Sequence, residues 1–243
     1  MLLNSAEQKA PWYGALELAP GSAIWQGSIG DGAIHRHFAA QAVLAQEPVG
    51  VIDALGDRHS ARCILIDPFA PHRLEPTEHA VSIYVEPVRR GPAAALEALL
   101  APARRSDSVV ILAAPGTPPF WSAWLNNPAS VRLRLDPKLE EILAQIDASL
   151  PDDTLTVAAA ASQCGLSEDR FRHYFAEEVG ISYRRYQTWR RIVAAVISLQ
   201  SGCNVTSAAH QAGFADAAHF ARTLKSTFGI TASQTLIAKH PEI

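Results

Sequence analysis

The sequence contains no apolar run that approaches the roughly 20 residues a bilayer-spanning helix needs. Its first residues, MLLNSAEQKAPWYG, lack the basic segment and the apolar stretch of a secretory signal. These two absences predict a cytoplasmic protein that has no membrane partner.

Cysteine is scarce. The chain has three cysteines, an odd number, widely spaced and without a CxxC pair: Cys63, Cys164 and Cys203. We therefore expect neither a disulfide framework nor a zinc knuckle, but small apolar core residues in a reducing compartment.

Signatures of catalysis are also missing, because the chain shows no catalytic triad, no P-loop and no dinucleotide-binding fingerprint. We therefore expect no enzyme activity and no cofactor. What is present is the composition of an ordinary soluble protein: 243 residues, of which 48% are hydrophobic and 19% charged, suit one large domain or two ordinary ones.

Charge is distributed unevenly along the chain. Residues 153–240 contain nine basic and six acidic side chains, whereas residues 1–136 contain eleven basic and thirteen acidic ones. A basic C-terminal part beside a mildly acidic N-terminal part suits a protein that binds DNA.

The first 88 residues predict short strands. Apolar runs such as residues 63–67 (CILID) and 81–87 (VSIYVEP) are separated by turn signals. Many short strands with such turns indicate a small β-sandwich or barrel. Residues 92–105 then predict a short helix, and residues 109–115 form an isolated apolar segment.

Residues 136–150 predict a helix that opens a second domain. Asp136 is placed to cap this helix, and Pro137 to occupy its first position. Its apolar residues recur at helical spacing, at Leu139, Ile142, Leu143, Ile146 and Leu150. We therefore divide the chain into domains of residues 1–135 and 136–243.

The C-terminal domain contains an internal repeat. Residues 164–182 align with residues 212–231, at a distance of about 49 residues and with one inserted residue. Gly165 matches Gly213, and Phe171 matches Phe220. The predicted motifs cover residues 154–180 and 204–229, and residues 182–201 predict one connecting helix.

Each copy predicts two short helices joined by a tight turn. In the first copy Thr156 and Ser167 cap the two helices, and Gly165 supplies a left-handed turn. The second copy repeats this pattern with Thr206, Gly213 and Asp216. A helical bundle without a nucleic-acid role could explain one copy. Two matched copies on a rigid helix instead predict two recognition helices about one DNA turn (~34 Å) apart.

Residues 154–236 resemble the DNA-binding domain of the AraC/XylS family of transcription regulators, and GFADAAHFARTLKSTFGITASQ closely resembles the family's diagnostic segment. The chain departs from the family pattern at Leu224, where an aromatic residue is usual, at Ala232, where proline is usual, and at Thr235-Leu236. The resemblance implies an activator or repressor that binds double-stranded DNA, and an activator would also contact RNA polymerase.

The resemblance also implies which residues contact DNA. The family's base-contacting positions fall on Asp169, Arg172, His173, His219 and Arg222. Arg172 can read guanine and Asp169 can accept a hydrogen bond from cytosine. The second recognition helix also carries alanines at Ala217, Ala218 and Ala221. We therefore expect the first motif to carry most of the sequence readout.

Phosphate contacts are expected from four basic residues, Arg184, Arg185, Arg190 and Lys225. For each of them an ordinary solvated surface charge is the alternative interpretation.

Residues 20–87 resemble, less specifically, the small cupin-type sensory domain that many AraC members carry. The predicted fold class is therefore α+β, with a cupin-like β-barrel domain followed by an all-α double helix-turn-helix domain. Either a small-molecule pocket or an oligomerisation domain without a ligand fits this part. The helix of residues 92–103 is the candidate dimer contact, by family analogy. The pocket would be bounded by Trp25, His35, His37, His72 and Tyr84.

His35 and His37 lie two residues apart, so on a strand both would point to one face. Together with His72 they could form a metal site. The metal-binding cupin pattern, however, has a carboxylate a few residues after such a pair. This chain has Ala39, Ala40 and Gln41 there, so we expect no metal.

The leading interpretation is a sequence-specific regulator of the AraC type that responds to an effector through its N-terminal domain. The alternative is a metal-dependent cupin enzyme fused to a DNA-binding domain. A third interpretation, an adaptor that uses its helices for protein contacts, fits poorly with four outward basic residues, Arg172, His173, Arg222 and Lys225.

Overall fold

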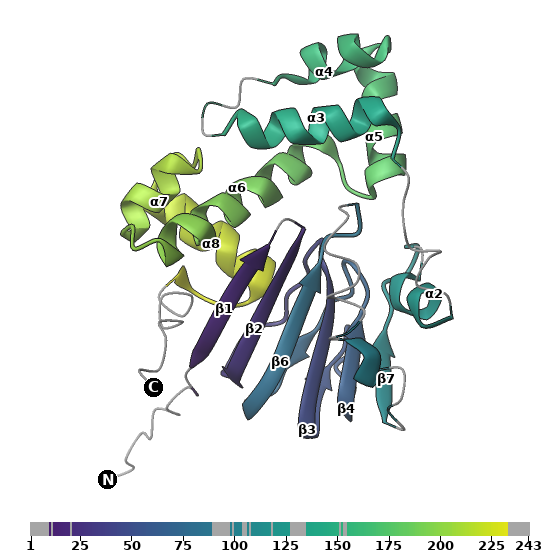
Figure 1. Ribbon diagram of the computed structural model, residues 1–243, viewed down its shortest axis with the longest axis vertical. Helices are drawn as coiled ribbons and strands as arrows, with labels where there is room; N and C mark the ends of the chain where they lie inside the picture. The colour runs from purple at the N-terminus through teal and green to yellow at the C-terminus, as the bar shows by residue number, and fades with distance from the viewer. Residues whose placement is uncertain are drawn as a thin grey trace.

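The computed structural model describes residues 10, 12–19, 21–88, 98, 100–103, 106, 108–117, 119–126, 135–150, 152 and 155–232. A β-sheet is built from the N-terminal part of the chain and a group of helices from the C-terminal part. Figure 1 shows helices α3 to α8 gathered at one end of the sheet. The structure therefore has the expected N-terminal sheet domain and C-terminal helical domain.

Within the described residues, seven strands form the sheet: β1 (Gly14–Ala19), β2 (Ser22–Ile29), β3 (Ala40–Ile52), β4 (Arg58–Ile66), β5 (Arg73–Leu74), β6 (Thr77–Val85) and β7 (Val109–Leu112). Their order is β1-β2-β6-β3-β4-β7, with β5 paired to β3. All pairs are antiparallel except β4 with β7. Among the described strands β1 and β7 end the sheet unpaired to each other, so the sheet is open rather than the closed barrel we expected.

The described helices are α2 (Phe120–Asn126), α3 (Pro137–Ala148), α4 (Val157–Cys164), α5 (Glu168–Val179), α6 (Tyr183–Gln200), α7 (Val205–Gln211) and α8 (Ala217–Phe228). None of them is long and apolar enough to cross a membrane. The helix predicted at residues 92–105 lies mostly outside the described residues, although residues 98 and 100–103 are helical.

Helix α3 begins as its sequence predicts. The Asp136 side chain accepts a hydrogen bond from the Lys138 backbone N–H at 2.8 Å, and Pro137 takes the first helical position. The buried face of α3 consists of Leu139, Ile142, Leu143 and Ile146. This helix therefore packs its apolar stripe inward, as the periodicity indicates.

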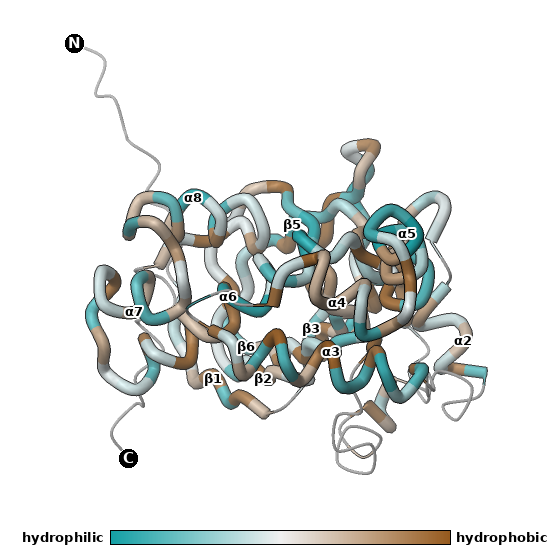
Figure 2. The backbone as a smooth tube through the Cα atoms, turned by 90° about the horizontal axis from the view of Figure 1, so that it is seen from above, coloured by the Kyte–Doolittle hydropathy of each residue, from teal (hydrophilic) through white to brown (hydrophobic). Residues whose placement is uncertain are grey.

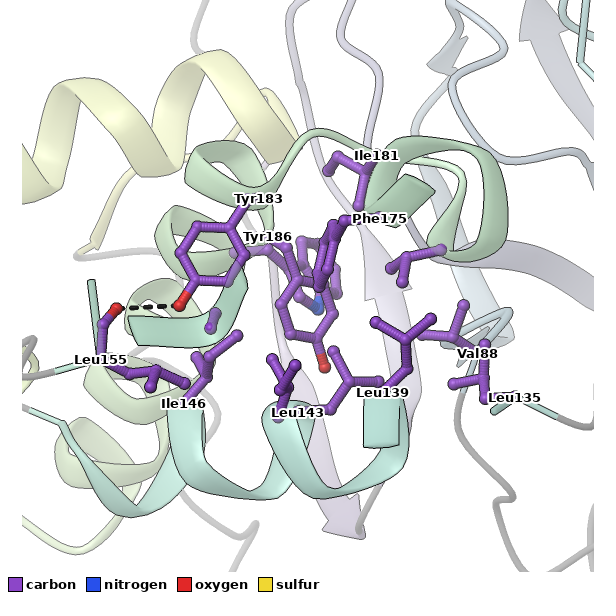
Figure 3. Packing of buried hydrophobic residues seen from close by; sticks show 14 of the residues in the cluster. Val88, Leu135, Leu139, Leu143, Ile146, Leu155, Phe175, Ile181, Tyr183 and Tyr186 are labelled. Atoms are coloured by element: carbon purple, nitrogen blue, oxygen red, sulfur yellow. Dashed lines mark hydrogen bonds between the residues drawn. The ribbon is translucent and has the colours of Figure 1, made fainter. Parts of the chain in front are cut away.

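The core beneath α3 is continuous with the sheet domain. Figure 3 shows its leucines facing Phe175, Tyr183 and Tyr186 from α5 and α6. The Tyr183 hydroxyl donates to the Leu155 carbonyl at 2.8 Å, which satisfies a polar group inside this core. The same buried cluster includes Phe38 and Val88 from the N-terminal domain. The helices are therefore packed against the sheet domain instead of being joined to it only by a linker.

All three cysteines are free thiols. Cys63 is buried, and Cys164 and Cys203 are half-buried. Burial raises the pKa of the Cys63 thiol to about 11, which keeps it protonated and unreactive near neutral pH.

Candidate nucleic-acid interface and ligand cavity

The first motif consists of α4, a three-residue turn and α5. The Thr156 hydroxyl caps α4 by accepting from the Ala159 N–H at 3.2 Å, and Ser167 caps α5. Gly165 ends α4 with a φ of 69°, in the left-handed region that glycine adopts without strain. All three predicted roles are confirmed.

Helix α5 has one buried and one solvent-facing side. Its core positions Phe171, Phe175 and Val179 are at most 2% exposed. The predicted base-contacting residues Asp169, Arg172 and His173 are exposed on the other side.

The Arg172 guanidinium is not free in this structure. It donates to Asp169 and to Glu168, at 2.7 Å in each case. The side chains involved are about half exposed or more, and exposed pairs of this kind are worth only about 0–1 kcal/mol. Both pairs can therefore open at low cost when another acceptor approaches.

The second motif repeats the first with one difference. The prediction that Thr206 caps α7 is wrong, because the Asn204 side chain accepts from the Ser207 N–H at 2.9 Å and α7 begins at Val205. Asn is as good a cap as Thr or better, so the helix starts two residues earlier than a cap at Thr206 would allow. Gly213 turns the chain with a φ of 79°. Asp216 caps α8, accepting from the His219 N–H at 2.6 Å.

Helix α8 buries Phe220 and Leu224. His219, Arg222 and Lys225 are exposed. Figure 2 shows α5 and α8 on either side of α6. Ala161 of α4 and Ala209 of α7 are at most 2% exposed, and each belongs to the buried cluster of its motif.

The three predicted phosphate contacts on the connecting helix α6 differ in exposure. Arg184 and Arg185 are exposed. Arg190 points inward: its guanidinium donates to Glu86 and Asp147, at 2.6 Å in both cases, and its side chain is only 12% exposed. The structure therefore does not support a phosphate contact by Arg190, since two carboxylates already hold its charge.

The Glu86 carboxylate connects the two domains. It accepts from the Trp189 ring N–H at 2.8 Å as well as from Arg190. At the C-terminal end of α6, the Gln200 amide donates to the Leu16 carbonyl of β1 at 2.9 Å. The Ala33 N–H donates to the Gly229 carbonyl, just beyond α8, at 3.2 Å. These contacts fix α6 and the end of α8 against the sheet domain.

A cavity of about 430 Å³ lies between the domains. Its lining is largely apolar and includes Trp25, Tyr84, Trp189, Val193 and Phe228. The charged residues that reach it are Glu86, Asp147 and Arg190. Of the five predicted pocket residues it contains Trp25 and Tyr84, whereas the three histidines do not line it.

The histidines form a separate buried cluster. His35 pairs with His72 in an isolated β-bridge, and His37 lies in the segment before β3, so the predicted strand placement of the histidine pair is wrong. Burial lowers the pKa of His37 to about 3, and it lowers the pKa of His72 and of His35 as well. All three rings are therefore neutral near pH 7. Burial also raises the pKa of the neighbouring Tyr84 hydroxyl.

Residues 160–237 match the helix-turn-helix domain family. This match identifies an AraC-type helix-turn-helix domain in the C-terminal part of the chain. No curated protein sequence matches the chain.

Solved structures resemble most of the chain. ToxT from Vibrio cholerae O395 is 13% identical, with a TM-score of 0.54 over 90% of this chain and 98% of that one. ToxT bound to (E)-4-(8-methylnaphthalen-1-yl)but-3-enoic acid is also 13% identical, with a TM-score of 0.56 over 90% and 99%. At this identity the likeness shows the fold alone. It does show that a fold of this kind, over 90% of this chain, occurs in another protein.

An AraC-type transcriptional regulator from Chromobacterium violaceum is 24% identical over 41% of this chain and 89% of its own, with a TM-score of 0.38.

Sequence reasoning missed the residues that join the AraC-type domain to the sheet. Glu86 and Asp147 stand in ordinary-looking polar positions, and only their approach to Arg190 in space marks them. Gln41, considered only as a missing carboxylate, lies at the centre of the histidine cluster. Its spacing after the histidine pair was the available signal.

Proposed function

We propose that this chain is a cytoplasmic transcription regulator that binds a specific DNA site through α5 and α8 and that adjusts this binding to a small molecule held between its domains. The proposal divides the chain into a sensory domain of residues 1–135, of the cupin-like type, and a DNA-binding domain of residues 136–243. It includes no catalysis. An activator of this kind would also contact RNA polymerase, and residues 92–103 are the proposed dimer contact.

The observation that carries the proposal is the repeated motif on one helix. Both copies have a capped second helix that follows a left-handed glycine, at Gly165 and Gly213. They are joined by α6, whose 18 residues make a helix about 27 Å long. A spacer of that length suits two recognition helices that enter successive major grooves, about 34 Å apart.

Exposure and chemistry support a division of roles among the contacts. Base contacts are assigned to Asp169, Arg172 and His173 on α5, and to His219 and Arg222 on α8. Arg172 can leave its weak intrahelical pairs for the two acceptors of a guanine. Phosphate contacts are assigned to Arg184, Arg185 and Lys225, all of which are exposed.

A salt titration of duplex binding tests the electrostatic part. Three phosphate contacts contribute a slope of about −2.7 to a plot of log affinity against log salt concentration, at about −0.9 each. Lys225→Ala should reduce the slope by about 1. The control is Arg58→Ala, because Arg58 is an exposed arginine of β4 paired with Glu75. A flat salt response of the full chain, or an equal change in the control, would contradict the proposal.

The cavity supports the effector part of the proposal. It is lined by both domains, so a ligand there would contact β2 and α6 at once. Arg190 is already held by Glu86 and Asp147, so the charged lining carries an excess of negative charge. ToxT has been solved with a carboxylic acid bound. For this chain the lining instead favours an apolar ligand with a neutral or cationic head group.

Thermal unfolding with three ligands of equal chain length tests this assignment. We expect 1-decanol and decylamine to raise the melting temperature more than decanoate does. Val193→Trp should abolish the effect because Val193 lines the cavity, whereas Ile111→Trp, at an exposed position of β7, should not. A larger shift with decanoate, or an unchanged response of Val193→Trp, would exclude this site.

A further inference from the structure

The histidine cluster brings three imidazoles and one amide together at the junction of β3, β6 and the end of α8. The His35 and His72 backbones exchange hydrogen bonds at 3.0 and 2.9 Å, which fixes the two residues side by side. The His37 ring lies 5.6 Å from the His35 ring and 5.2 Å from the His72 ring. One ring nitrogen from each histidine lies within 4.8 Å of those of the other two.

The backbone determines which nitrogen of each ring carries its proton. The Nδ1 atoms of His35, His37 and His72 lie 2.9, 2.8 and 2.9 Å from backbone carbonyl oxygens. A carbonyl can only accept, so each Nδ1 donates, and each Nε2 of a neutral ring keeps its lone pair. Imidazoles that ligate metals are held by this kind of hydrogen bond from the second ring nitrogen.

The Gln41 amide lies where two of these lone pairs meet. Its Oε1 atom is 3.2 Å from His37 Nε2 and 3.1 Å from His72 Nε2. Three acceptor atoms cannot hydrogen-bond one another. Either the amide is turned by 180°, so that its NH₂ group donates to both rings, or a cation lies among the three atoms.

The spacing of Gln41 Oε1 from two ring nitrogens is close to that of metal ligands. Around a tetrahedral ion, bonds of about 2.0–2.2 Å place neighbouring ligand atoms about 3.3–3.6 Å apart. Gln41 Oε1 lies 3.2 Å from His37 Nε2 and 3.1 Å from His72 Nε2, so small side-chain shifts would open these separations to that spacing. Imidazole nitrogen is the preferred ligand of zinc, copper, nickel and iron, and an amide oxygen can stand where a carboxylate would be expected.

We propose that His35, His37, His72 and Gln41 bind one late first-row divalent metal ion and thereby brace the C-terminal end of α8. The geometry outweighs the sequence-based expectation of no metal, which rested on the missing carboxylate. The His37 ring stacks on Phe228, the last residue of α8, at 5.5 Å. Ala33 links the next residue to the cluster: its N–H donates to the Gly229 carbonyl, and its own carbonyl accepts from His35 Nδ1.

The site is tested without DNA, on the full chain after treatment with a chelator. Co²⁺ is titrated while its visible absorption bands are followed, and Zn²⁺ is then added in competition. We expect one equivalent of Co²⁺ to bind, its bands to be displaced by Zn²⁺, and the metal content to be one ion per chain. Hydrogen exchange of residues 225–232 should slow when the metal is bound. Wild-type protein that binds no stoichiometric metal would overturn the site, and unchanged exchange would overturn the bracing of α8.

Variants decide whether these residues are the ligands. His35→Ala changes the least buried of the three histidines and should lose stoichiometric binding while the far-UV circular dichroism stays unchanged. Gln41→Glu should bind more tightly, because a carboxylate is the stronger ligand. His79→Ala, at an exposed position on β6, is the control for surface histidines. Full binding by His35→Ala, or loss of binding in the control, would contradict the proposal. Should His35→Ala unfold, weaker binding by Gln41→Glu than by wild type would contradict it independently.

Discussion

Arg172 and Arg190 show how differently two arginines of one domain are used. Arg172 is about half exposed and pairs within its own helix, so its charge remains available to a ligand. Arg190 is nearly buried and bridges Glu86 and Asp147 across the domains. Both are basic residues on amphipathic helices in the sequence, and only the partners in space separate a surface contact from a structural bridge.

Arg172→Ala should relax sequence preference, because the loss of a bidentate contact costs about 1–3 kcal/mol at one base pair. Lys225→Ala should weaken binding to all sequences about equally. Each variant is measured against duplexes that carry single-base substitutions across the bound site. Equal loss of preference in both variants would contradict the separation into base and phosphate contacts.

At the scale of the elements, both recognition helices could be predicted from sequence. Their caps, turn glycines and aromatic faces are local features, and local features determine local structure. The start of α7 was misjudged because Asn204 and Thr206 are both capable caps two residues apart. The open sheet could not be predicted, since a strand pattern fixes alternation along a strand but not which strand edges meet.

Gly213→Val tests the second turn. The native φ of 79° is left-handed, and a β-branched residue there should lower the free energy of unfolding by about 1–2 kcal/mol or more. DNA affinity should fall as well, because α8 is displaced. Gly213→Asn is the matched control, since Asn tolerates this conformation better. Chemical denaturation and duplex binding measure the two effects. Identical stability and binding in Gly213→Val and wild type would mean that the turn is not a constraint.

At the scale of the whole molecule, the two domains share a core and enclose a cavity. Phe38 and Val88 belong to the same buried cluster as α3, α5 and α6. Trp25 and Val193 line the cavity from opposite domains. None of this packing follows from sequence periodicity, which reports that a face is apolar but not what covers it. Of the residues predicted to bound a pocket, Trp25 and Tyr84 line this cavity, whereas the three histidines lie elsewhere.

The central claim is that this molecule reads DNA with two unequal recognition helices. The division rests on Asp169, Arg172 and His173 of α5, as opposed to the alanine-rich face of α8.

Selection of bound fragments from random duplex DNA, with the full chain at a fixed salt concentration, tests the claim most directly. The account predicts an enriched site with two blocks about 10–10.5 base pairs apart, centre to centre. One block should show the stronger base preference, and this preference should weaken when the selection is repeated with Arg172→Ala. The account would be contradicted if no site were enriched, or if the base preference in the more strongly selected block were the same with Arg172→Ala as with the wild type.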